Sequence, residues 1–241
     1  MSNPDAASDT SAKTKLRRGR YISDSIVERR RRMLDVAKAM IAEGGGEGFT
    51  IRELGRRAKV SVTTIYATYG DKEGLIAAAI GDHYEGLPVA RARQTTSVSA
   101  LVAATDLSCE AILGNRAYAQ QYAELYFSPT VDRRIYKVIQ ETATARAGQF
   151  PWLLKAIRDG DVIPGLEADR IVTLLANQRL VVLHDWAQGR IPDEDLSTKM
   201  KVGFIIVARG FTRGPTQARL EAELKKLLRA KGGERRSQAQ L

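Results

Sequence analysis

The fold of this chain is decided by residues 50–75, which read TIRELGRRAKVSVTTIYATYGDKEGL. Thr50 can cap a helix, and Glu53 three residues later completes the pattern of a capping box. Ser61 can cap a second short helix directly after a tight turn that starts at Lys59. Two short helices joined by such a turn are typical of a helix-turn-helix. The pattern therefore predicts helices over 51–58 and 62–69, and the motif spans residues 50–69.

One further helix is predicted on each side of this motif. Upstream, apolar residues recur at spacings of three, four and seven from about residue 25, as on one face of a helix. The glycines at 44–46 end that helix, because glycine readily takes the left-handed conformation of a helix C-terminus. Downstream, Asp71 caps a helix that runs to about Leu87. Within the motif, Gly55 leaves room where the two helices touch.

The string at 50–75 resembles the signature of the TetR family of repressors. It has a Thr-x-x-x-Leu opening, an Ala-x-Val-Ser turn, a Thr-x-Tyr-x-x-Tyr recognition helix and an Asp-Lys-Glu-x-Leu start of the next helix. Upstream, residues 34–37, LDVA, followed by Gly44 resemble the first helix of the family, so the resemblance covers residues 27–87. In two departures from the family pattern, Lys59 replaces a glycine and Gly55 replaces an alanine. Each departure is expected to reduce stability by about 1 kcal/mol. For Lys59 this holds if its backbone is left-handed.

The resemblance implies that residues 62–69 lie in the major groove of double-stranded operator DNA. Threonine hydroxyls near the start of this helix can meet phosphates or base edges, and Val62 can touch a thymine methyl. Lys72 matches a lysine that holds a phosphate at the start of the fourth helix. For Tyr66, packing and phosphate contact are equal alternatives, and for Tyr69 packing against the first helix is favoured. The predicted DNA-binding residues are Arg52, Ser61, Val62, Thr63, Thr64, Tyr66, Tyr69 and Lys72.

Positive charge is concentrated at the two ends of the chain, which has a formal net charge of +10. Residues 13–34 alone hold nine basic and two acidic side chains. Such a segment suits a polyanion, either nucleic acid or an anionic membrane surface, although it also suits a solubilising tail. We expect residues 1–24 to form a disordered basic arm. The arm can enter an adjacent minor groove or act as a nonspecific electrostatic tether, and the tether is favoured.

The rest of the sequence also reads as helices separated by glycine and proline. They are predicted near 98–113, 116–127, 130–159, 167–188, 193–211 and 216–231. Residues 204–207, FIIV, suit a strand equally well, but nothing else in the chain offers a strand partner. The predicted fold is therefore all-α, with a three-helix DNA-binding domain at 25–87 and a larger helical ligand-binding and dimerisation domain at 88–213. A basic helix or tail follows at 214–241.

The resemblance implies a homodimer that forms through the last two helices of the larger domain. Residues 171–186 are apolar nearly all round, so this helix must be covered on both sides. Its own domain can cover one side and a partner subunit the other; the alternative is a fully buried helix of a monomer. The predicted interface residues are Leu175, Val182, Trp186 and Phe204.

An effector pocket is predicted in the larger domain, because aromatic side chains gather in the second half of the chain. The alternative for each of them is ordinary core packing, and for His83 a place on the surface. Arg116, Arg133 and Arg134 can pair with an anionic ligand such as an acyl-CoA, or can be solvated helix surface. The predicted pocket residues are His83, Cys109, Tyr118, Tyr122, Tyr126, Phe150, Trp152 and His184.

Several classes of protein are disfavoured by the composition. Two histidines and one cysteine are too few for a strong metal or cysteine–histidine site, and neither a Gly-x-Ser-x-Gly elbow nor a phosphate-binding loop is present in the sequence. We therefore predict no enzyme, no catalytic residue, no metal and no cofactor. The single cysteine excludes a disulfide framework and fits a reducing cytoplasm. No apolar run approaches the roughly 18–20 residues that span a bilayer, so no membrane partner is expected.

The sequence thus predicts a sequence-specific DNA-binding transcriptional regulator. We expect a repressor that a small apolar or aromatic effector releases from a palindromic operator. The alternative is a nonspecific or architectural nucleic-acid-binding helical protein without an effector, in which the basic ends provide most of the binding.

Overall fold

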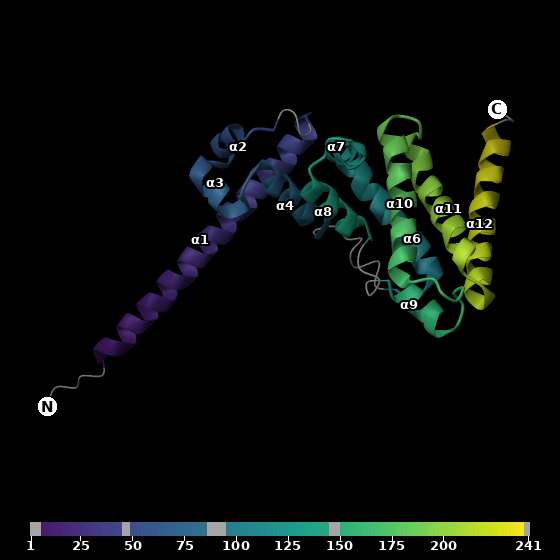
Figure 1. Cartoon of the computed structure of the whole chain (residues 1–241), viewed down its shortest axis with the longest axis horizontal. Helices are drawn as coiled ribbons and strands as arrows, with labels where there is room; N and C mark the ends of the chain where they lie inside the picture. Colours follow the sequence, from purple (N-terminus) through teal and green to yellow (C-terminus); the bar gives the residue numbers. More distant parts are fainter. Residues whose placement is uncertain (1–5, 45–48, 86–94, 145–149, 239–241) are drawn as a thin grey trace.

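The computed structural model describes residues 6–44, 49–85, 95–144 and 150–238, and this part of the chain is helical apart from one isolated β-bridge. The helices form a small N-terminal group and a larger C-terminal group, and the two termini lie at opposite ends of the molecule (Figure 1). The predicted all-α class is therefore confirmed. No helix in these described ranges is both long and apolar enough to cross a membrane.

The N-terminal group consists of α1 (Ala6–Gly44), α2 (Ile51–Ala58), α3 (Val62–Tyr69) and α4 (Lys72–Glu85). The C-terminal half of α1 buries the predicted apolar face from Met33 to Ile41, whereas Ile26 is 48% exposed. α1 begins at Ala6, where a disordered arm up to residue 24 was expected. The alanine, lysine, arginine and leucine residues of this segment favour a helix, which explains the difference. The predicted end of α4 near Leu87 lies outside the described residues.

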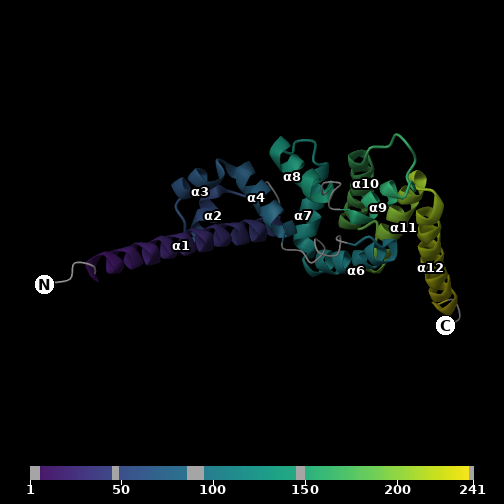
Figure 2. The same cartoon turned by 90° about the horizontal axis from the view of Figure 1, so that it is seen from below.

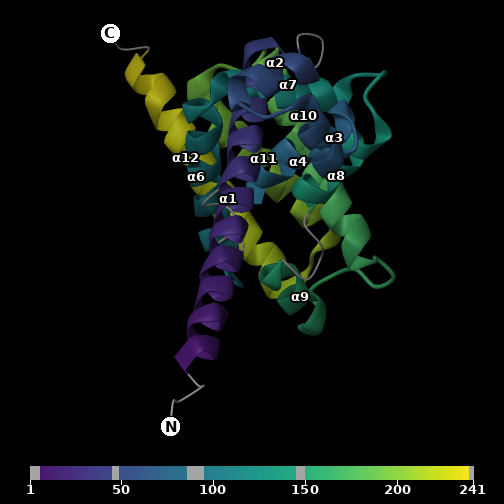
Figure 3. The ribbon, with the colours of Figure 1, turned by 90° about the vertical axis from the view of Figure 1, so that its left-hand side faces the viewer.

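The free end of α1 extends away from the rest of the molecule, as the views from below and from the side show (Figures 2 and 3). The other end of α1 packs against α2, α4 and α7. The basic residues at 13–20 are therefore carried on a projecting helix.

The C-terminal group consists of α6 (Val98–Gly114), α7 (Arg116–Phe127), α8 (Arg133–Thr144), α9 (Pro151–Arg158), α10 (Ala168–Ala187), α11 (Asp193–Phe211) and α12 (Gly214–Gln238). The single helix predicted over 130–159 is wrong, because α8 and α9 are separate. Pro151 occupies the first turn of α9, where its missing N–H is harmless; inside a longer helix the same ring would clash with the preceding turn. Residues 204–207 are helical and lie within α11.

α10 and α11 pack side by side, and α12 covers α11 and α6 (Figure 1). Gly203 of α11 lies against the side chain of Gln178 of α10, so that an added Cβ would lie 1.8 Å from Nε2 of Gln178. On α12, Leu220 is fully buried, whereas Leu228 is 57% exposed. α12 thus belongs to the C-terminal core through one face and leaves the other face to solvent.

The two helical groups share one continuous hydrophobic core. α4 packs on α8, and α1 packs on α7. Leu75 and Ile80 of α4 belong to the same buried cluster as Tyr118 of α7 and Ile135 of α8. An ion pair between Asp71 at the start of α4 and Arg134 of α8, at 2.7 Å, reinforces this contact at the surface. A movement of α7 or α8 must therefore displace α4.

The start of α12 is fixed by the buried carboxylate of Asp161. The backbone N–H and the hydroxyl of Thr216 both donate to one oxygen of Asp161, at 2.9 and 2.7 Å. The bridge between Val162 and Thr212 lies beside this contact. Hydrogen bonding by the Thr216 hydroxyl lowers the pKa of Asp161 below its usual 3.8.

Asp161→Asn should lower the melting temperature at pH 7 by roughly 2–4 °C, because the charged acceptor of the two Thr216 bonds is lost. Since the folded pKa is lowered, the stabilisation is present above the normal pKa and is lost as the pH falls through the folded value. The difference between the two proteins should therefore narrow below pH ~4.

Thermal denaturation between pH 3 and 7 measures this difference. Asp159→Asn is the matched control, because its exposed pair with Lys155 should contribute little. Equal melting temperatures of the wild type and Asp161→Asn at pH 7 would contradict the assignment.

Candidate DNA-binding site

Both helices of the helix-turn-helix begin at the predicted capping residues. The Thr50 hydroxyl accepts a hydrogen bond from the N–H of Glu53 at 3.2 Å, and the Ser61 hydroxyl accepts one from the N–H of Thr64 at 3.2 Å. The Glu53 carboxylate does not complete the predicted capping box, because it accepts bonds from the guanidinium groups of Arg56 and Arg57. These two cations lower the pKa of the Glu53 carboxyl to about 2.

The turn between α2 and α3 explains both departures from the family pattern. Lys59 has φ 55° and ψ 48°, so this position is left-handed as anticipated. The N–H of Val60 then donates to the carbonyl of Gly55 at 3.0 Å. An added Cβ at Gly55 would lie 2.8 Å from the Val60 carbonyl oxygen and 3.4 Å from Cδ1 of Ile65. Gly55 is therefore required for the close approach of the two helices.

α3 presents most of its surface to solvent. Of its eight residues, all of which the structure describes, only Ile65 is fully buried. Val62 and Tyr66 are 40% and 48% exposed, and Thr63 is exposed beside them. Ala67 is also exposed, one helical turn after Thr63, and the sequence analysis missed it because alanine carries no polar signal. These four residues form the open face of α3.

Three of the predicted DNA-binding residues have structural roles instead of a free side chain. The hydroxyls of Ser61 and Thr64 lie 2.8 Å apart, and both belong to the N-terminal cap of α3. The hydroxyl of Tyr69 is buried, its ring packs against the core, and burial raises its pKa. The packing alternative therefore describes Tyr69 better than a DNA contact does.

Two cations lie at the edges of the candidate surface. Arg52 is exposed in the first turn of α2. Lys72 is half-buried in the first turn of α4 and lines a cleft of about 660 Å³ between α4, α7 and α8. In contrast, the guanidinium of Arg57 bonds to the carboxylate of Glu43 at 2.7 Å, which ties α2 to α1.

The predicted pocket residues do not gather at one place. Phe150 lines a cavity of about 100 Å³, whereas His83, Tyr118 and Tyr122 line a smaller one of about 20 Å³. Trp152 is core, with its ring 5.6 Å from that of Phe204.

The other three predicted pocket residues line neither cavity. Cys109 is buried against Met200, and burial raises the pKa of its thiol to about 11. Tyr126 meets Phe127 edge to face and His184 meets it at a tilt, with ring centroids 5.0 and 4.4 Å apart.

The predicted interface residues face inward in the structure. Leu175 and Trp186 are 7% and 1% exposed, and the Trp186 indole donates to Asp193 at 2.9 Å. Val182 packs against the core, and Phe204 lines the larger cavity. The exposed apolar residues of these helices are instead Leu174 and Val181 on α10 and Ile206 on α11, each about half exposed.

Two of the arginines considered for an anionic ligand are already paired. Arg134 binds Asp71 and Asp132, at 2.7 and 3.1 Å. Arg116 binds Asp193 and lies 5.2 Å from the centre of the Trp186 ring.

Known proteins resemble this chain both in sequence and in fold. Residues 33–79 match the family model of bacterial regulatory proteins of the tetR family. A curated relative, the HTH-type transcriptional repressor KstR of Mycolicibacterium smegmatis, is 36% identical over 63 residues. That match spans 26% of this chain and 31% of the relative, so the chain covers less than a third of the length of this relative.

Solved structures extend the likeness in fold to most of the chain. FadR of Thermus thermophilus, a TetR family repressor in complex with lauroyl-CoA, superimposes with a TM-score of 0.57 at 18% identity, over 75% of this chain and 94% of that one. A tetR-family regulator of Streptomyces coelicolor gives 0.56 at 16% identity, over 84% and 87%. The fatty acid degradation regulator FadR of Bacillus halodurans gives 0.56 at 15%, over 73% and 96%.

Gly55→Ala should destabilise the protein by about 1–3 kcal/mol, although alanine is the better helix former, because the new methyl would meet a backbone carbonyl. Gly81→Ala is the matched control in α4, where an added Cβ would lie 3.9 Å from its nearest neighbour. That control should be neutral or stabilising. Chemical denaturation measures both, and a Gly55→Ala protein as stable as the wild type would refute the close approach.

Proposed function

This chain belongs to the TetR family of bacterial regulatory proteins, and we propose that it is a transcriptional repressor that binds a palindromic operator through α3. The observation that carries the proposal is the open face of α3, formed by Val62, Thr63, Tyr66 and Ala67. A helix that buries one side chain and exposes a flat row of small and aromatic side chains fits a major groove about 12 Å wide. The proposed function is DNA binding, which needs no catalytic site, and we propose none.

Reading and anchoring are divided between different side chains in this proposal. Thr63 and Val62, in the first turn of α3, read base edges. Tyr66, Arg52 and Lys72 contact phosphates, Lys72 with the help of the N–H groups at the start of α4. The basic residues at 13–20 on the projecting end of α1 add sequence-independent attraction to the phosphate backbone.

The proposed assembly is a twofold dimer, because a palindrome is read by two copies of α3. Its interface contains Leu174 and Val181, which lie seven residues apart and hence on one stripe of α10. Ile206 of α11 joins them as the third half-exposed aliphatic side chain of this helix pair. The proposed interface thus uses exposed neighbours of the residues that the sequence predicted, such as Leu174 beside Leu175 and Val181 beside Val182.

Release from DNA is proposed to follow binding of a small apolar or aromatic molecule in the C-terminal group. The shared core and the Asp71–Arg134 ion pair connect α8 to the first turn of α4, next to Lys72. A ligand that prefers one arrangement of these helices changes the distance between the two copies of α3 in the dimer.

Substitutions on the two parts of the surface should have different effects on DNA binding. Lys72→Ala should weaken binding about equally on all sequences and lower the salt slope by about one per subunit. Thr63→Ala should change which operator variants are tolerated, at a cost of about 1–3 kcal/mol for a base contact. Selection from random DNA, followed by binding isotherms at several salt concentrations, measures both.

Lys225→Ala, at an exposed position on α12, is the control and should leave DNA preference unchanged. If selection yields no preferred sequence, the protein is a nonspecific nucleic-acid binder. If Thr63→Ala and Val62→Ala leave the preference unaltered, α3 is not the reader.

Leu174→Glu and Val181→Glu should convert the dimer to a monomer, because each introduces an unpaired charge into the apolar interface. Leu228→Glu on α12 is the matched control, since it alters an equally exposed aliphatic residue away from that face. Light scattering at micromolar concentration measures the mass. A monomeric wild type, or a Leu174→Glu protein that remains dimeric, would rule out this interface.

A further inference from the structure

Two cavities in the C-terminal group meet at the same two residues. The larger cavity, of about 100 Å³, lies between α6, α10 and α11, and its walls include Leu101, Met200 and Phe204. The smaller one, of about 20 Å³, lies between α4, α6, α7 and α10. Ser108 of α6 and Arg179 of α10 line both cavities. A ligand in the larger cavity is therefore one side chain away from α4.

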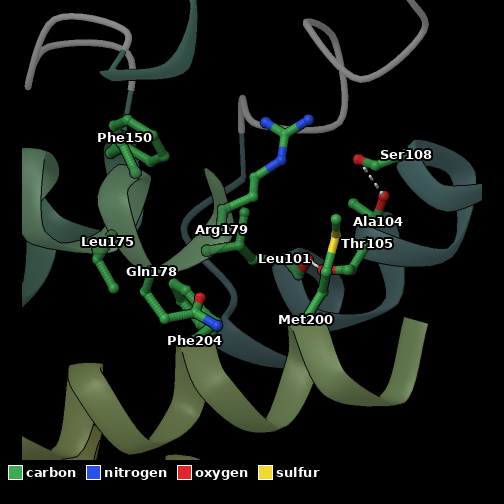
Figure 4. A pocket seen from close by; sticks show the side chains of 11 residues that line it. Leu101, Ala104, Thr105, Ser108, Phe150, Leu175, Gln178, Arg179, Met200 and Phe204 are labelled. Carbon is green, nitrogen blue, oxygen red and sulfur yellow. Dashed lines mark hydrogen bonds between the residues drawn. The ribbon is translucent and has the colours of Figure 1, made fainter. Parts of the chain in front are cut away.

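Arg179 is the unusual member of this wall. It is half-buried, and among the described residues no carboxylate or other acceptor is bonded to its guanidinium. The carboxylate in this neighbourhood, Asp106, is held by Lys201 at 2.5 Å and by the Ser197 hydroxyl at 2.5 Å. Figure 4 shows the Arg179 side chain extended, with its guanidinium directed away from Gln178 and Phe204. A cation that is partly withdrawn from water without a counter-charge is a binding site for an anion.

A second polar group without a partner lies in the smaller cavity. The hydroxyl of Tyr118 is buried and has no hydrogen-bond partner within the described ranges. Burial raises the pKa of this phenol, which therefore stays protonated and can donate. The Tyr118 ring packs at a tilt of 39° against His83 of α4, with the ring centroids 4.2 Å apart. A ligand atom bound to this hydroxyl would thus be coupled to the helix that carries the DNA-binding domain.

We propose that the effector is a small monocarboxylate whose apolar group fills the larger cavity and whose carboxylate binds Arg179 and Tyr118 where the two cavities meet. The identification as effector rests on the proposed repressor function, whereas the binding site does not. The walls of the larger cavity are mainly aliphatic and aromatic, which suits a hydrocarbon group. Its volume is below the ~150 Å³ of a cavity that holds benzene, so the hydrocarbon part is a short alkyl chain, smaller than a phenyl ring.

Calorimetric titration of the protein with butanoate and with pentanoate tests the site in the absence of DNA. Butanamide, which has nearly the same shape and no charge, is the matched ligand control. Butanoate should bind saturably, and the amide should bind at least about tenfold more weakly. Failure of both carboxylates to bind up to ~10 mM, or equal affinity for the amide, would overturn the proposal.

Variants then assign the two polar groups. Arg179→Gln should weaken butanoate binding by about ten- to a hundredfold and leave binding of the amide unchanged, and Arg179→Lys should restore part of the loss. Tyr118→Phe should weaken butanoate binding by about three- to tenfold. Arg170→Gln, an exposed position on the same helix, is the matched control and should change nothing. Unchanged carboxylate affinity in Arg179→Gln would overturn the assignment of Arg179.

A third measurement separates the site from its role. Butanoate should weaken binding to the selected operator in the wild type and not in Arg179→Gln. If the carboxylate binds through Arg179 but DNA affinity is unchanged, the effector role is overturned while the site stands. If no operator can be selected, the proposed repressor function fails, and the titration still decides the site.

Discussion

A single fully buried side chain, Ile65, anchors α3 to the protein. A helix of eight residues is too short to be stable alone, so its position depends on what holds its first turn. That turn is held by the Ser61 cap, by the left-handed Lys59 and by the contact of Gly55 with the Val60 carbonyl. The open face of α3 is available because these three backbone features, rather than burial of its own side chains, fix the helix.

The packing of α3 on its neighbours also links it to the rest of the molecule. α3 packs against α2 and α4, and α4 shares a hydrophobic core with α7 and α8. Interiors packed this closely shift between discrete arrangements instead of deforming smoothly. The ring contact between Tyr118 of α7 and His83 is one of the places where the C-terminal group touches α4 directly.

Local signals in the sequence predicted the helix-turn-helix almost residue by residue. Caps, the glycines at 44–46 and the spacing of apolar residues act within a few residues, so Thr50, Ser61 and Gly55 could be interpreted without a structure. The prediction of a single helix over 130–159 was wrong at Pro151. A proline is compatible with the first turn of a helix but not with its interior, and the sequence alone did not show which of the two positions Pro151 occupies. The exposed face of α10 could not be predicted, because a helix that is apolar all round has no periodicity that separates its buried residues from its exposed ones. The cavities were not predictable, since Ser108 and Arg179 meet only through the packing of α6 on its neighbours.

α12 has a consequence for how copies of this protein can associate. It covers one flank of α11 and the adjacent side of α6, and Asp161 fastens its first turn in place. In the proposed dimer, a second copy packs on the other side of the α10–α11 pair, because α12 occupies this flank. A molecule with one self-complementary side forms closed pairs, whereas two such sides would permit filaments that grow without limit. α12 would thus limit the size of the proposed assembly without taking part in its interface.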